Sequence, residues 1–428
     1  MSTAPTVQPI DTLVAEAKKV LPGGSFGNMP AEVILAAGKG GHIWDENGRE
    51  YIDYLLGSGP MFIGHAHPEV TKAVQTQLDL GSTFFGNNKH GIALAQAICD
   101  AVPCAEQVRF VCTGTEADLY AMRAVRAFRR RDKILKFEGG YHGMSDWALM
   151  SMAPKNPGNF PRATPDSAGI PKSVADEMLI AAFNDVDMVE SLIKEHRDEL
   201  AGVIVEPFQR LLPPAPGFLQ ALRRITSEHG IPLIFDEVVT GFRFAYGGAQ
   251  EYYGVTPDLC TLGKIVGGGY ALAAIAGRAD IMKHFDRLEV PEEDFLFQVG
   301  TLSGNPIAAV AGLATLDVLK QPDVYDQVFK TGRTLMSALS EILKKAGIKA
   351  TVVGEPPLFD VLFTDHKLND YRDTLKGDKA IAGKFNKLLR ERGLMKGESK
   401  YYVSVAHTQA DIDHTIRAWT ESAKELSR

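Results

Sequence analysis

Two stretches of the sequence each deliver one charged side chain from the end of an apolar run. In "IPLIFDEVVTGFR", Asp236 ends a predicted strand, and in "DLCTLGKIVGGGY", Lys264 ends another. An ionised carboxylate is costly at such a place unless a cation meets it. A helix cap or an ion pair with Arg243 would explain Asp236 alone. The lysine does not belong to a nucleotide-binding loop, because Asp258 and Ile265 occupy positions that this motif reserves for Gly and for Ser or Thr.

The lysine and the aspartate together favour a different chemistry. A lysine attacks carbonyl groups when burial or a neighbouring positive charge disfavours its ammonium form. Pyridoxal phosphate is the common aldehyde held in this way, as a Schiff base, and its ring nitrogen needs a buried carboxylate to stay protonated. We therefore expect the Schiff base at Lys264 and the carboxylate at Asp236. The three glycines from Gly267 to Gly269 would let the backbone turn closely around the bound group, or they form an ordinary tight loop.

The phosphate group of the cofactor needs a binding site of its own, and "FVCTGTEADLYAMR" contains a candidate. Gly114 and Thr115 lie between a predicted strand and the start of a predicted helix, where backbone N–H groups attract anions. Thr followed by Glu is also a common way to begin any helix. In "KFEGGYHGMSD", Tyr141 is suited to stacking on a flat ring, and His142 is a candidate contact of the cofactor. Tyr141 could instead be a core aromatic, and His142 a loop histidine with structural partners only.

Two further stretches fit the same site. "VIVEPFQR" brings Glu206 and Gln209 to another strand end, where the glutamine could donate to a ring oxygen and the glutamate could order the groups around it. "GTLSGNPIAAVAG" presents Thr301 before a Gly-Asn-Pro turn. Both are also compatible with plain loop chemistry.

Composition limits the kinds of partner. The chain has 428 residues, 45% of them hydrophobic, and a net charge of −7 with acidic and basic residues mixed. A small-molecule partner is favoured over nucleic acid. The four cysteines show no CxxC spacing, which predicts reduced thiols and a cytoplasmic protein. No secretory signal or run of membrane length is found. No metal site is expected at His65 and His67, because no set of carboxylates or cysteines accompanies them.

The elements that must position these residues follow an alternating pattern. From about residue 94 to residue 316, short β-branched runs alternate with segments of helical period, which predicts an α/β fold with a mostly parallel sheet between helices. Ligands bind at the carboxyl ends of the strands in such sheets. We expect a large cofactor-binding domain over 61–320 and a smaller α+β domain over 321–428. The segment 1–60, with a hairpin at Asn47-Gly48, is expected to pack with the smaller domain.

As an ordered set, the motifs resemble those of class III pyridoxal-phosphate aminotransferases of fold type I, and most of all the branch of glutamate-1-semialdehyde aminomutase. The similar stretches run from "YIDYLLGSGPMFIGHAHPEV" through "GTEA", "KFEGGYHG", "IVEP", "IFDEVVTGFR", "TPDLCTLGK" and "GTLSGNP" to "VSVAHTQADID". The resemblance implies that Lys264 forms the Schiff base and that Asp236 meets the ring nitrogen. It places Tyr141 on one ring face and Val238 on the other.

The same resemblance assigns the remaining contacts with the cofactor. Gly114 and Thr115 would hold the phosphate, and Gln209 would lie near the ring hydroxyl. Thr301 would reach the phosphate from the second subunit, because the family forms homodimers with shared active sites.

The substrate-binding positions depart from those of the aminomutase. "PGGSFGNMPAEV" contains no basic residue where that enzyme has an arginine for the substrate carboxylate, and "GESKYYVSVAHT" lacks the arginine of ornithine and GABA-type relatives. We therefore expect an aminotransferase with an amine or non-standard amino acid as donor and a carbonyl compound as acceptor. Candidate substrate-pocket residues are Ser58, Phe84, Phe85 and Tyr402. An aminomutase, a racemase, a decarboxylating transaminase and a non-catalytic protein that binds pyridoxal phosphate stay open as alternatives.

Overall fold

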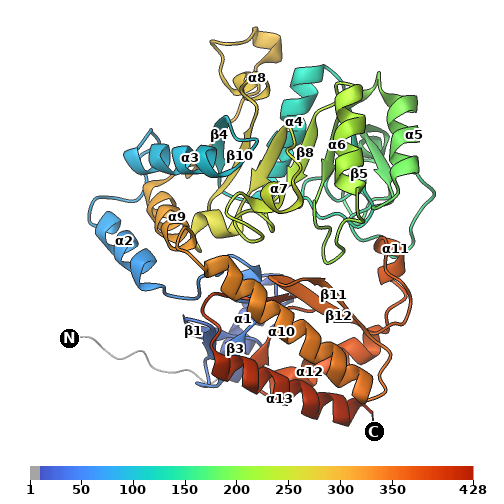
Figure 1. Ribbon diagram of the computed structural model, residues 1–428. Coiled ribbons are helices and arrows are strands. Elements are labelled where there is room, and N and C mark those ends of the chain that lie inside the picture. Colours follow the sequence, from blue (N-terminus) through green and yellow to red (C-terminus); the bar gives the residue numbers. More distant parts are fainter. Residues whose placement is uncertain (1–9, 428) are drawn as a thin grey trace.

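The computed structural model describes residues 10–427, which form an upper part around one large sheet and a lower part with two smaller sheets (Figure 1). Within these residues, seven strands build the large sheet in the order β4-β10-β9-β8-β7-β5-β6. Their bounds are β4 Gln107–Val111, β5 Lys133–Phe137, β6 Met178–Ala181, β7 Leu200–Val205, β8 Leu233–Asp236, β9 Leu259–Leu262 and β10 Ala273–Gly277. Strands β6, β5, β7, β8 and β9 are parallel, and β10 is antiparallel to both of its neighbours. The predicted mostly parallel sheet is confirmed.

The sheet is buried on both faces because its strands are apolar at successive positions. Ile234 of β8 packs against helix α4 (Gly114–Arg129), whereas Leu233 and Phe235 belong to the cluster on the opposite face. Helices α6 (Phe218–Glu228) and α9 (Pro306–Leu319) contribute to that second cluster. Side chains alternate between the faces with a period of two, so Asp236 lies on the same face as Ile234.

One strand of the sheet was not predicted. Strand β6 has only four residues and pairs with β5 at one edge of the sheet. It follows a long segment with little regular structure between β5 and residue 178. A short apolar run of this kind gives no periodic signal, which explains the omission.

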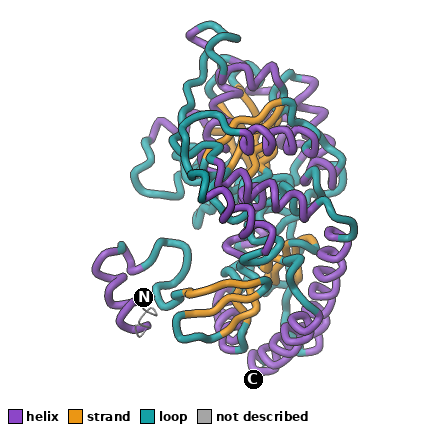
Figure 2. The backbone as a smooth tube through the Cα atoms, turned by 90° about the vertical axis from the view of Figure 1, so that its left-hand side faces the viewer, coloured by secondary structure: helices purple, strands orange, loops and turns teal. Residues whose placement is uncertain are grey.

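The lower part joins segments from both ends of the described chain. Strands β1 (Leu35–Lys39), β2 (His42–Asp45) and β3 (Glu50–Asp53) form antiparallel pairs, with the predicted hairpin between β2 and β3. Strand β13 (Leu394–Met395) then adds to β3 in parallel. The third sheet has the order β11-β12-β14, with bounds β11 Thr351–Glu355, β12 Leu358–Leu362 and β14 Tyr401–Tyr402. Figure 2 shows the strands in these two separate regions. The domain limits at residues 60 and 320 stay a prediction.

Helices cover both parts. Those not yet named are α1 Ile10–Val20, α2 Pro68–Leu78, α3 Lys89–Ala101, α5 Val186–His196, α7 Gly248–Tyr253, α8 Ala279–Met282, α10 Val324–Lys345, α11 Tyr371–Thr374, α12 Lys379–Glu391 and α13 Gln409–Leu426. Helices α10, α12 and α13 lie together in the lower part (Figure 1). Among residues 10–427, no helix combines the length and apolar character needed to cross a lipid bilayer.

Candidate active site

The structure brings the predicted aspartate and lysine to the ends of two neighbouring strands. Asp236 is the last residue of β8 and lies opposite Thr261 of the parallel strand β9. Lys264 follows β9 after one glycine, and its backbone is in the left-handed region, with φ +52°. A sharp turn therefore leads from the strand into the segment after Lys264 at the carboxyl edge of the sheet, where α/β proteins bind ligands.

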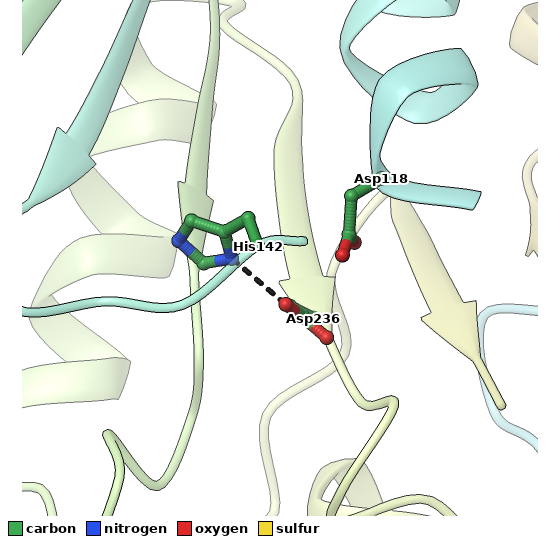
Figure 3. Close-up of side chains that lie close together, drawn as sticks. All are labelled: Asp118, His142 and Asp236. Atoms are coloured by element: carbon green, nitrogen blue, oxygen red, sulfur yellow. Dashed lines mark hydrogen bonds and ion pairs between the residues drawn. The ribbon is translucent and has the colours of Figure 1, made fainter. Parts of the chain in front are cut away.

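Asp236 accepts from His142, from the Val238 backbone and, at 3.4 Å, from the Thr261 hydroxyl, and it has no lysine or arginine partner among the described residues. Its Oδ2 lies 2.8 Å from Nδ1 of His142, and its Oδ1 accepts the backbone N–H of Val238 at 3.1 Å. Figure 3 shows the imidazole beside this carboxylate. Both side chains are less than 5% exposed. The alternative ion pair with Arg243 does not form, because that guanidinium donates to the carbonyl oxygens of Val239 and Gly59 instead.

Helix α4 begins where the phosphate seat was predicted. Thr113 caps the helix and forms a capping box with Glu116. The Thr113 hydroxyl accepts the N–H of Glu116, and the Glu116 side chain accepts the N–H of Thr113. The N–H groups of Gly114 and Thr115 then have no partner within residues 10–427. The hydroxyl of Thr115 accepts the N–H of Met144 at 3.2 Å, so the loop after β5 lies against the start of α4. Free N–H groups at a helix N-terminus suit an anion.

Val238 links the start of α4 with the lysine turn. A Cβ atom on Gly114 would lie 3.0 Å from Cγ1 of Val238, and a Cβ on Gly263 would lie 3.1 Å from the same atom. Such contacts are tighter than those of most side chains. Glycine at both positions therefore leaves Val238 packed between the helix start and the residue before Lys264.

Tyr141 lies in the loop after β5, half-buried. Its backbone N–H donates to Glu206 at 2.9 Å, and the Arg210 guanidinium lies 5.3 Å from the centre of its ring. Gln209 donates to the carbonyl oxygen of Glu138 at 2.8 Å. Within the described part of the chain, Oε1 of Gln209 and Nε2 of His142 are buried without a partner. Buried polar atoms are normally bonded, so these two point to a polar ligand or an ordered water beside them.

The glycines after the lysine also approach other segments closely. Gly268 has φ +57°, and a Cβ on it would lie 2.4 Å from the carbonyl oxygen of Ala311 in α9. A Cβ on Gly269 would lie 3.0 Å from the sulfur of Met61. Glycine at these positions lets the backbone approach α9 and the segment before α2. The expected turn around the bound group stays a prediction.

The surroundings of Lys264 lower the pKa of its amine. Burial lowers the pKa of Lys264, the nearby charges of Lys400 and Arg243 lower it further, and Tyr402 and Asp236 oppose them in part. Burial alone would raise the pKa of Tyr402, but the positive charges of Lys400, Lys264 and Arg243 outweigh this effect and lower it. An uncharged lysine is the form that attacks a carbonyl.

Tyr402 forms one wall of this region with the loop before residue 60. It is 3% exposed and has the Arg243 guanidinium 4.9 Å from its ring centre, and Ser58 contributes to the lowering of its pKa. The other predicted pocket residues are not brought here within one chain. Phe84, Phe85 and Thr301 are exposed, and among residues 10–427 no hydrogen bond or aromatic contact links them to Lys264, Tyr141 or Tyr402.

Three residues near the site were missed or assigned another role in the sequence. Asp118 lies beside Asp236 (Figure 3). Its burial was predictable from the sequence, because residues 117, 121, 122 and 125 mark the buried face of α4. Lys400 carried no signal, since only the fold brings it to Lys264. Arg243 was considered only as a partner of Asp236.

Comparison with known proteins agrees with this geometry. A family model, aminotransferase class-III, matches residues 25–417. An omega-transaminase from Sphaerobacter thermophilus is 36% identical, with a TM-score of 0.92 and 98% of each chain covered. A structure described as a transaminase with PLP bound is 28% identical, with a TM-score of 0.89 and 99% of each chain covered. A glutamate-1-semialdehyde aminomutase from Pseudomonas aeruginosa PAO1, at 23% identity, shares the fold, with a TM-score of 0.86 over 97% of this chain and 94% of that one.

The fold and the site define an enzyme of fold type I, the architecture of one large group of pyridoxal-phosphate enzymes. The chain belongs to the class-III aminotransferase family. The predicted family, fold class, enzyme class and cofactor are thereby confirmed.

The side chains present also fit that cofactor. Within the described residues, Nε2 of His142, Oε1 of Gln209 and the N–H groups of Gly114 and Thr115 have no partner, and these polar groups suit the ring and the phosphate of the cofactor.

Proposed function

We propose that the chain transfers an amino group from an amine or non-standard amino acid to a keto acid or another carbonyl acceptor, in two half-reactions that both use Lys264. The observation that carries the proposal is the meeting of Lys264 and Asp236 at neighbouring strand ends, one as a buried amine with a lowered pKa, the other as a buried carboxylate held by His142.

Each side chain around Lys264 has a definite task in this proposal. When bound, pyridoxal phosphate supplies a carbonyl carbon that accepts amines and a ring that withdraws electrons. Lys264 anchors it and, once the donor amine has taken its place, moves a proton at the donor carbon. Asp236 holds a proton at the ring nitrogen, and the N–H groups of Gly114 and Thr115 bind the phosphate.

The ring faces and edge are assigned to the remaining residues. Tyr141 lies on one face and Val238 on the other, which fixes the ring and excludes water. Gln209, whose Oε1 has no partner among the described residues, would offer this oxygen and a remaining amide hydrogen to the ring hydroxyl. His142 and Glu206 act through other residues. His142 orients Asp236, and Glu206 holds the backbone of Tyr141.

A cation near the lysine suits an acceptor with a carboxylate. Lys400 influences the pKa values of both Lys264 and Tyr402, and it lines a cavity of about 280 Å³ together with Gln209 and Arg210. We propose that Lys400 binds the acceptor carboxylate as a single cation, in place of the arginine that other family members use. Ser58 and Tyr402 then line the side that faces the donor.

A homodimer completes the site in this proposal. Thr301, Phe84 and Phe85 are exposed, and further large apolar side chains of the upper part are exposed as well. These are Leu80, Ile92, Tyr270, Phe297, Val299 and Leu302. Apolar exposure on this scale is typical of an interface. Thr301 would reach the phosphate of the partner subunit, and the two phenylalanines would border its substrate pocket. Analytical ultracentrifugation of the wild type should show a dimer, and the Ile92→Asp variant should form a weaker dimer. A monomeric wild type would contradict the assignment.

We also assign the chain to the cytoplasm. Its four cysteines are free thiols, two of them buried, as expected for a protein kept in a reducing compartment.

A panel of amines and amino acids with an added keto acid tests the reaction. We expect one amino group to appear on the acceptor for each donor consumed, and no turnover when the acceptor is left out. Turnover without acceptor would instead identify an aminomutase or a racemase, and acceptor-dependent release of carbon dioxide from the donor would identify a decarboxylating transaminase. The Lys264→Ala variant serves as the control, and its turnover at the wild-type rate would support a non-catalytic role for the lysine.

A further inference from the structure

A second buried carboxyl group lies against Asp236. Asp118 belongs to α4, on the face that packs against the large sheet together with Ala117 and Met122. Asp236 of β8 and Thr261 of β9 lie on the sheet face that meets this helix. Figure 3 shows Asp118 projecting from α4 beside the Asp236 carboxylate.

The hydroxyl of Thr261 lies between the two carboxyl groups. The hydroxyl oxygen of Thr261 is 2.6 Å from Oδ1 of Asp118 and 3.4 Å from Oδ1 of Asp236. One ligand atom each from Asp118, His142 and Asp236 lies within 4.8 Å of the other two. Asp118 is 2% exposed, and no lysine or arginine of the described chain forms an ion pair with either aspartate.

Two ionised carboxylates this close repel each other strongly in a dry interior. Burial raises the pKa of Asp118 well above its usual value, and the charges of Asp236 and, more weakly, Glu206 raise it further. The charge of Asp118 also affects the pKa values of Lys136 and Tyr141, and neither of these residues forms a hydrogen bond to Asp118. A proton kept on Asp118 removes the repulsion and turns this carboxyl group into a donor.

We propose that Asp118 is a positioning residue for Asp236, a neutral carboxylic acid that donates its hydrogen to Asp236 and fixes the direction in which that carboxylate faces the ring nitrogen. The ring contact itself rests on the proposed function. Asp236 then accepts from Asp118, from His142 and from the Val238 N–H. The three donors stabilise one negative charge, which is the charge that a cationic ring requires.

The Asp118→Asn variant tests the protonation state without the cofactor. An amide can accept from Thr261 and donate to Asp236, as the neutral acid does, but it cannot ionise. Because the folded pKa of Asp118 is raised, wild-type stability falls as pH increases from the unfolded value toward the folded one. The Asn variant lacks this loss. Melting temperatures of the cofactor-free full chain from about pH 5 to about pH 8 should therefore show an advantage of Asn over wild type that grows with pH. Parallel curves would overturn the proposal.

Cofactor affinity tests the positioning role. Asp118→Leu has a similar volume but no donor, so we expect it to bind pyridoxal phosphate about tenfold more weakly or worse, whereas Asn should stay within about threefold of wild type. Intrinsic fluorescence measures the dissociation constants. An Asn variant as weak as Leu, or a Leu variant equal to wild type, would contradict the role of Asp118 alone. A wild type that does not bind pyridoxal phosphate would instead overturn the proposed function. If the Leu variant fails to fold, the Asn comparison still decides.

Discussion

Gly59 controls the wall that holds Tyr402 near Lys264. Its backbone has φ +108°, and a Cβ atom there would lie 2.8 Å from Cε1 of Tyr402 and 2.9 Å from Nη2 of Arg243. Real Cβ atoms essentially never make contacts this short. In Gly59→Ala, the tyrosine ring or the guanidinium must therefore shift, and both contribute to the electrostatic environment of Lys264.

The cost of this substitution has two parts that a matched control separates. An alanine held at positive φ lowers the free energy of unfolding by about 1–3 kcal/mol. About 0.4–1 kcal/mol of this loss is offset, because alanine reduces the conformational entropy of the unfolded chain. Displacing packed side chains adds about 1–3 kcal/mol. Gly217 has φ +84° and no atom within 4 Å of its Cβ position, so Gly217→Ala carries the backbone part only. We expect losses of about 1–2 kcal/mol for Gly217→Ala and about 2–4 kcal/mol for Gly59→Ala.

Urea unfolding and steady-state kinetics measure the two effects. Gly59→Ala should have the lower unfolding midpoint and, because side chains beside the reacting lysine are displaced, about tenfold lower kcat/KM. Gly217→Ala should keep its activity, since Gly217 begins α6 without a contact to the site. Equal midpoints and equal activities in the two variants would refute the close packing of Gly59 against Tyr402.

Two further predictions concern lysines. Burial lowers the pKa of Lys136 from 10.5 to about 7. Between these two pH values the lysine is protonated in the unfolded state but not in the folded state. The free energy of unfolding of the wild type should therefore rise with pH in this window, by up to about 1.4 kcal/mol per pH unit. Lys136→Met should lack this rise in urea unfolding between about pH 7 and about pH 9, and an equal slope would contradict the assignment. Lys400→Ala should raise the KM of a keto-acid acceptor about tenfold and leave that of an aldehyde acceptor unchanged, whereas an equal increase for both acceptors would exclude carboxylate binding.

Much of the fold is local information in the sequence. The apolar runs that end at Asp236 and before Lys264 have the length and composition of buried parallel strands, and the structure has β8 and β9 there. The helix after Gly114 carries its own capping box in Thr113 and Glu116. These features depend on neighbours in the chain, so the sequence was sufficient to predict them.

The rest depends on contacts between distant segments. Strand β6 is short and at an edge, so its pairing with β5 decides its structure. Lys400 influences Lys264 only because the lower part folds against the sheet. Asp118 was the exception, since the apolar period of α4 already placed it on the buried face. The close approach of Gly268 to Ala311 of α9 likewise joins segments that are distant in the chain.

The central claim is that the amine of Lys264 holds the cofactor covalently. Purified protein incubated with pyridoxal phosphate, reduced with borohydride and digested should carry the label on the peptide that contains Lys264, and Lys264→Met treated in the same way should carry none there. A label confined to other lysines, or no label in the wild type, would contradict the account.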